Sequence, residues 1–136
     1  MQKIIFAVMV STMCLDFAAP LVAAPRMPDV RGTWECRGNL VMNNGSGGAQ
    51  LLPSTSTVRV DGQDGERFYG IIQEEWGGSL HEDPFVGRID RDRDGAELVS
   101  SSDKIEWDFI SRSVLISDSI GRGSALIFER ERCTKK

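Results

Sequence analysis

The sequence predicts an all-β protein: a small antiparallel up-and-down barrel of about eight strands, held by one disulfide. Three observations lead to this fold class. No stretch shows the i, i+3, i+4, i+7 spacing of apolar residues that an amphipathic helix needs. Apolar and polar residues instead alternate in short runs, and turn signals separate these runs about every 8 to 15 residues. Two cysteines, Cys36 and Cys133, stand near the two ends of the predicted domain.

Residues 1–24 predict a secretory signal peptide that is removed. Lys3 precedes an apolar stretch at 4–10, and small residues dominate 18–24. Polar residues and a proline interrupt the apolar run well short of the roughly 20 residues that cross a bilayer. We therefore expect an exported protein, periplasmic or secreted, that is not membrane-spanning and has a single domain over residues 25–136.

The cysteine count predicts one disulfide. Removal of the leader takes Cys14 away and leaves Cys36 and Cys133. An even number of cysteines in an oxidising compartment indicates a bridge. A zinc site is the alternative for these thiols, but the chain has a single histidine, His81, and too few of the usual ligands. We expect no metal and no cofactor.

The strands are expected at 33–42, 55–60, 67–73, 84–89, 96–100, 104–110, 113–118 and 124–132. The turns at 62–65 and 92–95 contain Gly and Asp, which tolerate positive φ and mark hairpin tips. Residues 43–48 are rich in Asn, Gly and Ser and predict a flexible loop, and 74–83 predict a second loop. The runs 68–72 and 85–89 share Phe-x-Gly-x-Ile, which predicts adjacent strands with the same inward face.

Pairing of the last strand with the first would close the barrel. It would bring Cys36 and Cys133 together and remove both sheet edges. Trp34 shares a strand face with Cys36 and is expected inside, near one end. In the last strand we expect Leu126 and Phe128 inward, which brings Arg130 towards the end where Trp34 lies.

Gly32-Thr33-Trp34 on the first strand, with a basic residue on the last, resembles the signature of calycin barrels, the group that includes lipocalins and avidins. The resemblance implies a barrel-closing role for Trp34 and Arg130, with the guanidinium packed on the indole. The strand continues with Cys36 where avidin has a polar biotin ligand, so biotin binding is not expected. The run 63–70, Gln-Asp-Gly-Glu-Arg-Phe-Tyr-Gly, also resembles small exported bacterial proteins and implies no particular activity.

Charge and motifs exclude several functions. The net charge is −4, which argues against nucleic acid and anionic membrane surfaces as partners. Residues 90–95 have the D-x-D-x-D-G opening of a calcium loop, but Ser101 stands where the bidentate Glu belongs, so we interpret them as a charged hairpin tip. The acid pairs 74–75 and 82–83 are strand neighbours that point to opposite faces. With His81 as the only candidate base, we do not expect an enzyme.

Trp76 lies in a short glycine-rich segment beside acidic residues. An exposed Trp in such a place is a common binding anchor, and the alternative is that it covers the end of the core. Together with Glu75 and His81 it forms the candidate binding rim.

The sequence thus predicts a non-enzymatic binding module. Its ligand would be a small apolar molecule that enters between residues 43–53 and 74–83 into an interior lined by Phe68, Phe85, Trp107 and Phe128. The alternative is a protein-facing or inhibitory role towards an envelope or extracellular protein, through the loops around Trp76. A hydrolase that uses His81 is the third reading.

Overall fold

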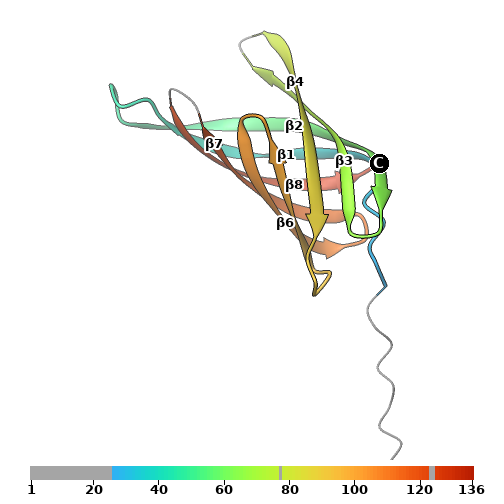
Figure 1. The fold of residues 1–136 in the computed structure, drawn as a ribbon. Coiled ribbons are helices and arrows are strands. Elements are labelled where there is room, and N and C mark those ends of the chain that lie inside the picture. Colours follow the sequence, from blue (N-terminus) through green and yellow to red (C-terminus); the bar gives the residue numbers. More distant parts are fainter. Residues whose placement is uncertain (1–25, 77, 123–124) are drawn as a thin grey trace, which may run out of the picture.

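The computed structural model describes residues 26–76, 78–122 and 125–136. It confirms the predicted fold class: eight antiparallel strands follow one another in chain order around a closed barrel (Figure 1). The strands are β1 (Gly32–Asn43), β2 (Ala49–Asp64), β3 (Arg67–Trp76), β4 (Ser79–Ile89), β5 (Gly95–Ser100), β6 (Asp103–Ser111), β7 (Val114–Arg122) and β8 (Leu126–Lys135). In the described residues no helix has the length and apolar character needed to cross a membrane.

All eight predicted strands are present, but β2 and β4 are longer than predicted. β2 begins at Ala49 and β4 at Ser79, so residues expected in loops belong to two hairpins. The β1–β2 and β3–β4 hairpins project from the barrel (Figure 1). In each hairpin the two strands pair with each other, and this pairing needs no buried face, so the sequence shows no clear alternation there.

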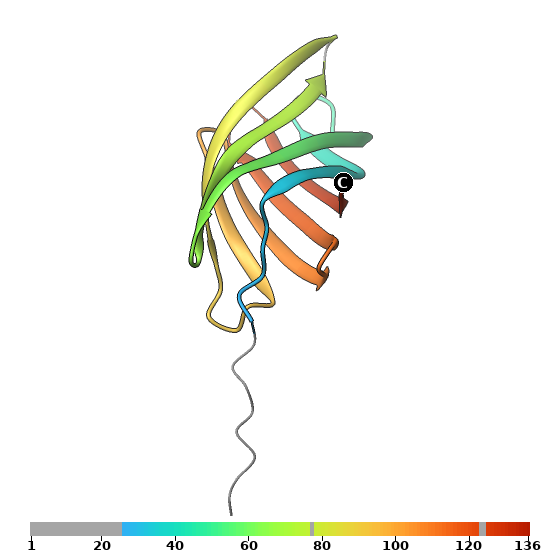
Figure 2. The ribbon, with the colours of Figure 1, turned by 90° about the vertical axis from the view of Figure 1, so that its right-hand side faces the viewer.

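Aromatic side chains fill the end of the barrel where the described chain begins. The Trp34 and Trp107 rings lie 5.9 Å apart, and Phe68 stacks on Trp107 at 5.6 Å. The segment before β1 runs across this end (Figure 2), where the Trp34 indole N–H donates a 2.9 Å hydrogen bond to the carbonyl of the buried Val30. We call this the closed end. The C-terminus lies there too, because Trp34 pairs with Lys135 in the β1–β8 ladder.

The opposite end is open. Pairing between β2 and β3 stops at Ser56 and Glu74, so the first seven residues of β2 have no partner on that side. Several side chains on the inner wall at this end are partly exposed, whereas those at the closed end are buried. Water therefore reaches the interior from this end, which we call the open end.

The predicted disulfide is confirmed. It links β1 to β8 at the junction that closes the barrel, which we call the seam. Cys36 and Cys133 are directly opposite on β1 and β8, with their Cα atoms 3.9 Å apart. Two residues further along, Gly38 faces Glu131, and a Cβ on Gly38 would overlap the Arg130 carbonyl. Glycine is therefore required for β1 and β8 to approach so closely here.

One prediction about strand faces is wrong. Leu126 and Phe128 do not face the interior; they are 74% and 47% exposed. The inner face of β8 carries Cys133 and Glu131 instead, both buried. On β8, acidic residues therefore face the interior, whereas Leu126 and Phe128 face outward. This is the reverse of what hydrophobic patterning predicts.

Candidate functional site

Carboxylates from three strands gather on the inner wall towards the open end. They are Glu74 on β3, Asp103 on β6, and Glu129 and Glu131 on β8. Strand alternation places each on the same face as the buried core, since Glu74 follows Ile72 and Glu131 precedes Cys133 by two residues. Among the described residues no Lys or Arg forms an ion pair with any of the four.

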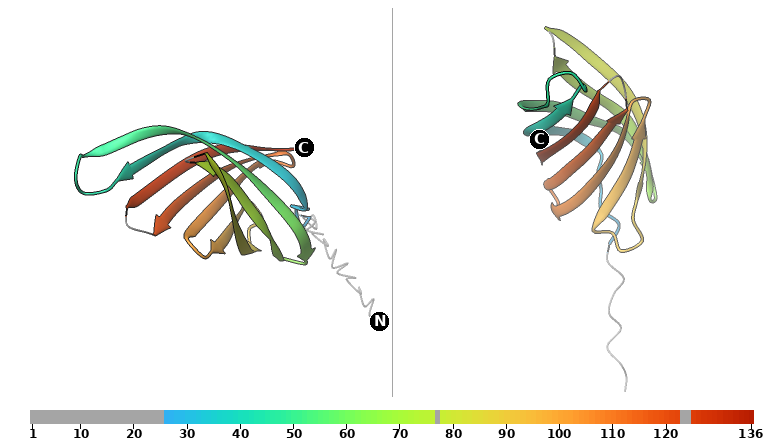
Figure 3. Two further views of the ribbon diagram at one scale, coloured as in Figure 1. Left: turned by 90° about the horizontal axis from the view of Figure 1, so that it is seen from above. Right: turned by 90° about the vertical axis from the view of Figure 1, so that its left-hand side faces the viewer.

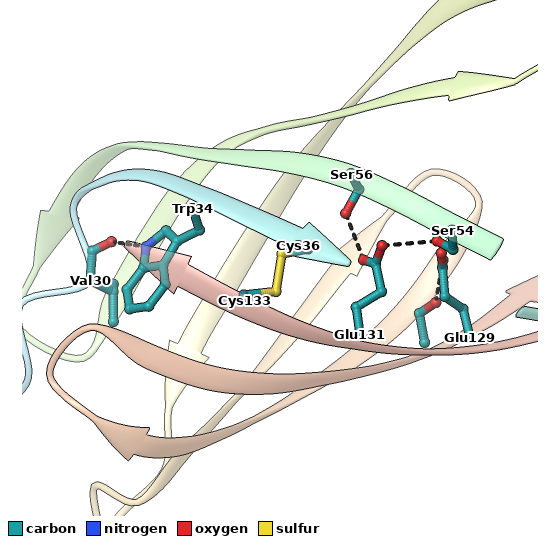
Figure 4. The surroundings of a disulfide bond; sticks show 9 residues. Val30, Trp34, Cys36, Ser54, Ser56, Glu129, Glu131 and Cys133 are labelled. Atoms are coloured by element: carbon teal, nitrogen blue, oxygen red, sulfur yellow. Dashed lines mark hydrogen bonds between the residues drawn. A yellow bond between two sulfur atoms is a disulfide. The ribbon is translucent and has the colours of Figure 1, made fainter. Parts of the chain in front are cut away.

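Glu131 is the deepest of these carboxylates and is held from across the seam. It is 5% exposed and accepts hydrogen bonds from the Ser54 hydroxyl at 2.8 Å and the Ser56 hydroxyl at 2.6 Å (Figure 4). Both serines lie on β2, so the side chain reaches past β1 at Gly38, where no side chain stands in the way. Burial raises the pKa of Glu131, and the two serine hydrogen bonds oppose that rise.

Burial and mutual repulsion also favour the protonated forms of two neighbouring acids. Burial, with the nearby charges of Glu131 and Glu74, raises the pKa of Glu129 to about 8. Burial, with the charges of Asp103, Glu131 and Asp83, raises the pKa of Glu74 to about 7. A bound cation would reverse this balance, because opposite charge favours the ionised carboxylates.

Asp83 has a different role on the same wall. Its carboxylate accepts hydrogen bonds from the hydroxyls of Ser101 at 2.5 Å and Ser102 at 2.6 Å, and longer ones from their backbone N–H groups. Burial alone would raise the pKa of Asp83, but serine hydrogen bonds lower it to about 2. Asp83 therefore ties the projecting β3–β4 hairpin to the β5–β6 turn.

Apolar side chains form the outermost layer of the inner wall. They are Leu40 and Met42 on β1, Leu52 on β2 and Ile127 on β8, and all four are partly exposed. The interior is thus ordered along its axis, from packed aromatic rings through the disulfide to carboxylates and serines, and then to this apolar mouth. Such a sequence of layers suits a molecule with one polar end and one apolar end.

The predicted rim residues all lie on the β3–β4 hairpin. Glu75 is exposed and pairs with Leu80, while His81 is exposed and pairs with Glu74. The side chain of Trp76 lies outside the described residues. The inward-facing acid is Glu74, not its neighbour Glu75, and the alternation from Phe68 through Ile72 could have identified it from the sequence.

The barrel-closing pair differs from the prediction. The structure places the Lys135 ammonium over the Trp34 ring, 5.5 Å from its centroid, and not Arg130. Arg130 pairs with Asn39 in the ladder, five residues from Trp34 along β1, and its guanidinium faces outward near Asp118 at 3.6 Å. A basic residue from the last strand still covers the indole, as the calycin resemblance implies.

The aromatic residues predicted to line a hollow interior do not do so. Phe68, Phe85 and Trp107 are buried against one another, with Phe68 and Phe85 at 6.0 Å, and fill the closed end. Phe128 is on the outer surface.

One group of metal-ligand types occurs in the described part of the chain. Cys36, Cys133 and Glu131 offer ligand atoms within 4.8 Å of one another. Both sulfur atoms are engaged in the disulfide. With the bridge closed, only the Glu131 carboxylate could bind an ion.

Comparisons with known proteins support the fold and no more. No protein-family model matches the sequence, and no curated protein matches it. Among solved structures, the S-type phycobiliprotein lyase CPES from Guillardia theta is similar, with a TM-score of 0.51 and 11% identity, over 79% of this chain and 88% of that one. The chain therefore shares its barrel architecture with that protein.

Proposed function

We propose that this chain is an exported, non-enzymatic binding module that takes a small amphipathic ligand into the open end of its barrel. The amphipathic character modifies the apolar ligand predicted from the sequence. One observation carries the proposal: beneath an apolar mouth, the inner wall has carboxylates that form no ion pair with a described Lys or Arg, and two of them, Glu74 and Glu129, are partly exposed. A ligand with an amine at one end and a hydrocarbon at the other matches both layers.

The similarity to a lyase adds support for a barrel that accommodates a ligand, but at this identity we take no activity from it. Export is proposed from residues 1–24, which lie outside the described residues. Mass spectrometry of the protein from its own host would show whether these residues are removed.

Calorimetric titration with three probes of equal chain length tests the ligand class: decylamine, decanol and decanoate. At a pH of about 9, above the pKa values of Glu74 and Glu129, we expect decylamine to bind more tightly than decanol and decanoate not at all, because the ionised carboxylates repel an anion. Equal or better binding of decanoate would show that the acids do not select the ligand. If none of the three binds, the proposed ligand class is wrong.

A matched pair of variants locates the site. Glu129→Gln removes an inner carboxylate, whereas Glu75→Gln removes an exposed one at the predicted rim. We expect the first to weaken decylamine binding about tenfold, consistent with about 1.4 kcal/mol for one partly buried charge contact, and the second to leave it unchanged. Equal effects would place binding elsewhere.

A protein-facing role is the second candidate. The β3–β4 hairpin projects beyond its neighbours and exposes Leu80 at 63% (Figure 1). Native mass spectrometry of the protein from its host separates the two functions. A retained small mass that leaves on unfolding supports ligand binding, and a bare mass directs the search to protein partners at this hairpin.

A further inference from the structure

The outer surface carries an apolar patch that the inner site does not involve. Leu51, Val41, Phe128 and Ile120 are directly opposite one another on β2, β1, β8 and β7. Their exposed fractions run from 40% to 70%, and Leu126 beside them is 74% exposed. The four strands lie side by side as one wall (Figure 3). These five side chains are the outer patch.

On the side of the β1–β2 hairpin, the chain around the outer patch carries no charged residue. The sequence contains no Asp, Glu, Lys or Arg between Arg37 and Arg59, although a quarter of the chain is charged. This segment includes most of the β1–β2 hairpin, whose outer face bears Val41 and Leu51. A water-facing hairpin ordinarily carries charges, and a contiguous exposed apolar area marks an interaction surface.

Beyond the pair Asn39 and Arg130 on its other side lie two arginines whose cross-strand partners in the described chain are not acidic. Arg37 and Arg132 are directly opposite on β1 and β8, an arrangement that repels. Their remaining cross-strand partners are Thr55 and Ile116, and neither arginine forms an ion pair with a described residue. The exposed Arg130, which lies nearer the patch, has Asp118 at 3.6 Å.

A second opposed pair, Arg67 and Arg88 on β3 and β4, differs in its cross-strand partners, which are acidic. There Asp64 lies opposite Arg67 and Glu97 opposite Arg88, and all four line a shallow outer groove of about 500 Å³. The arginines beside the outer patch lack such carboxylates. A binding partner with negative charge would complement Arg37 and Arg132.

We propose that the outer patch docks on the surface of an anionic phospholipid bilayer. The apolar faces of membrane-surface helices enter about 5–10 Å into the boundary between headgroups and acyl chains, and long arginine side chains can reach phosphates at the rim of such a contact. The net charge of −4, from which the sequence argued against anionic membrane surfaces, is a sum over the whole chain, and three of its acids, Glu74, Glu129 and Glu131, face the interior and not this wall. The inference is independent of the ligand site on the inner wall.

Co-sedimentation with vesicles tests the proposal, using the protein purified from its host. We expect binding to vesicles of equal parts phosphatidylcholine and phosphatidylglycerol, weakening as salt rises, and little binding to phosphatidylcholine alone. Arg37→Gln/Arg132→Gln should weaken binding about tenfold or more, since each basic residue near an anionic surface contributes about 1 kcal/mol. Arg67→Gln/Arg88→Gln is the matched control and should bind like the wild type.

Apolar variants complete the test. Phe128→Ser should weaken vesicle binding, whereas Tyr69→Ser, at a residue 58% exposed on β3 and outside the outer patch, should not. Urea unfolding of each variant confirms that it folds. The proposal is overturned if the wild type does not prefer anionic vesicles or if either control loses as much as its counterpart. It is equally overturned if the protein is a dimer that Phe128→Ser dissociates without any vesicle binding, because the patch would then join two copies of this chain.

Discussion

Lys135 and Arg130 are two cations on one strand with different surroundings. Lys135 lies over the Trp34 ring and donates a 2.9 Å hydrogen bond to the Asp29 carbonyl, while Arg130 is exposed beside Asp118. We expect Lys135→Gln to lower the free energy of unfolding by about 1 kcal/mol, because it removes a cation–π contact and a hydrogen bond. Arg130→Gln should change it by less than about 0.5 kcal/mol. Urea denaturation of both variants measures the difference, and a larger loss in Arg130→Gln would contradict the assignment.

Glu74 and Glu129 make stability depend on pH. Their pKa values in the folded chain, about 7 and about 8, lie above the ordinary value of 4.5, so the folded state binds protons more tightly than the unfolded state. The contribution of these two protonated acids to the stability of the folded state is fully present below pH 4.5 and is lost as pH rises through 7 and 8. We expect the unfolding free energy to fall by about 2 kcal/mol from pH 5 to pH 8, after allowance for partial exposure.

The variant Glu74→Gln/Glu129→Gln should flatten this profile, and Glu75→Gln should leave it unchanged. Denaturant melts at several pH values provide the measurement. A rise in the wild-type unfolding free energy from pH 5 to pH 8 would contradict this, because it would show that Glu74 and Glu129 are ionised in the folded state and that burial does not raise their pKa values.

Among single residues, the sequence correctly predicted the buried Trp34 and the bridge between Cys36 and Cys133. Strand alternation indicated the first, and the even cysteine count indicated the second. Glu129 and Glu131 were missed, since apolar patterning favoured Leu126 and Phe128 as the inner face of that strand. The alternation counted back from Cys133 leads to both acids. Buried polar groups are found by register and not by hydrophobicity.

Among the strands, β1 and β8 are held closer together than a side chain at Gly38 would allow. A Cβ there would overlap the Arg130 carbonyl and stand 2.7 Å from the Glu131 Cα, both of them backbone atoms that cannot move aside cheaply. We expect Gly38→Ala to lower the unfolding free energy by about 3 kcal/mol. Gly47→Ala in the β1–β2 tip, where nothing lies within 4 Å, should change it by less than about 0.5 kcal/mol. Thermal or urea unfolding compares them, and equal melting points would show that the seam relaxes.

The strands themselves were largely predictable, whereas the hairpin lengths were not. Turn signals at 62–65 and 92–95 separate buried strands with clear alternation. The added residues of β2 and β4, beginning at Ala49 and Ser79, bury little, and their pairing is decided by the neighbouring strand. Alternation of apolar and polar residues indicates a strand with one buried face, so it does not predict strand segments that project into solvent.

For the whole molecule, the disulfide is the largest single contribution that can be tested. It joins residues 97 apart and so closes almost the entire barrel in one loop. The chain-entropy model gives about 4 to 5 kcal/mol for such a loop. We expect Cys36→Ala/Cys133→Ala to lose roughly this much, measured by urea unfolding, with a steeper slope because the unfolded chain is more extended without the bridge. A loss below about 1 kcal/mol would mean that the unfolded chain is already compact without the bridge.

The described chain begins and ends on the side of the barrel opposite its mouth. The segment before β1 covers the closed end, and the backbone of Lys136 bonds to Thr33 beside it. A tag, a fused domain or a surface linker added after Lys136 would therefore hold the protein with its open end and both long hairpins pointing away from the attachment. Protein immobilised in this way should keep its inner wall accessible.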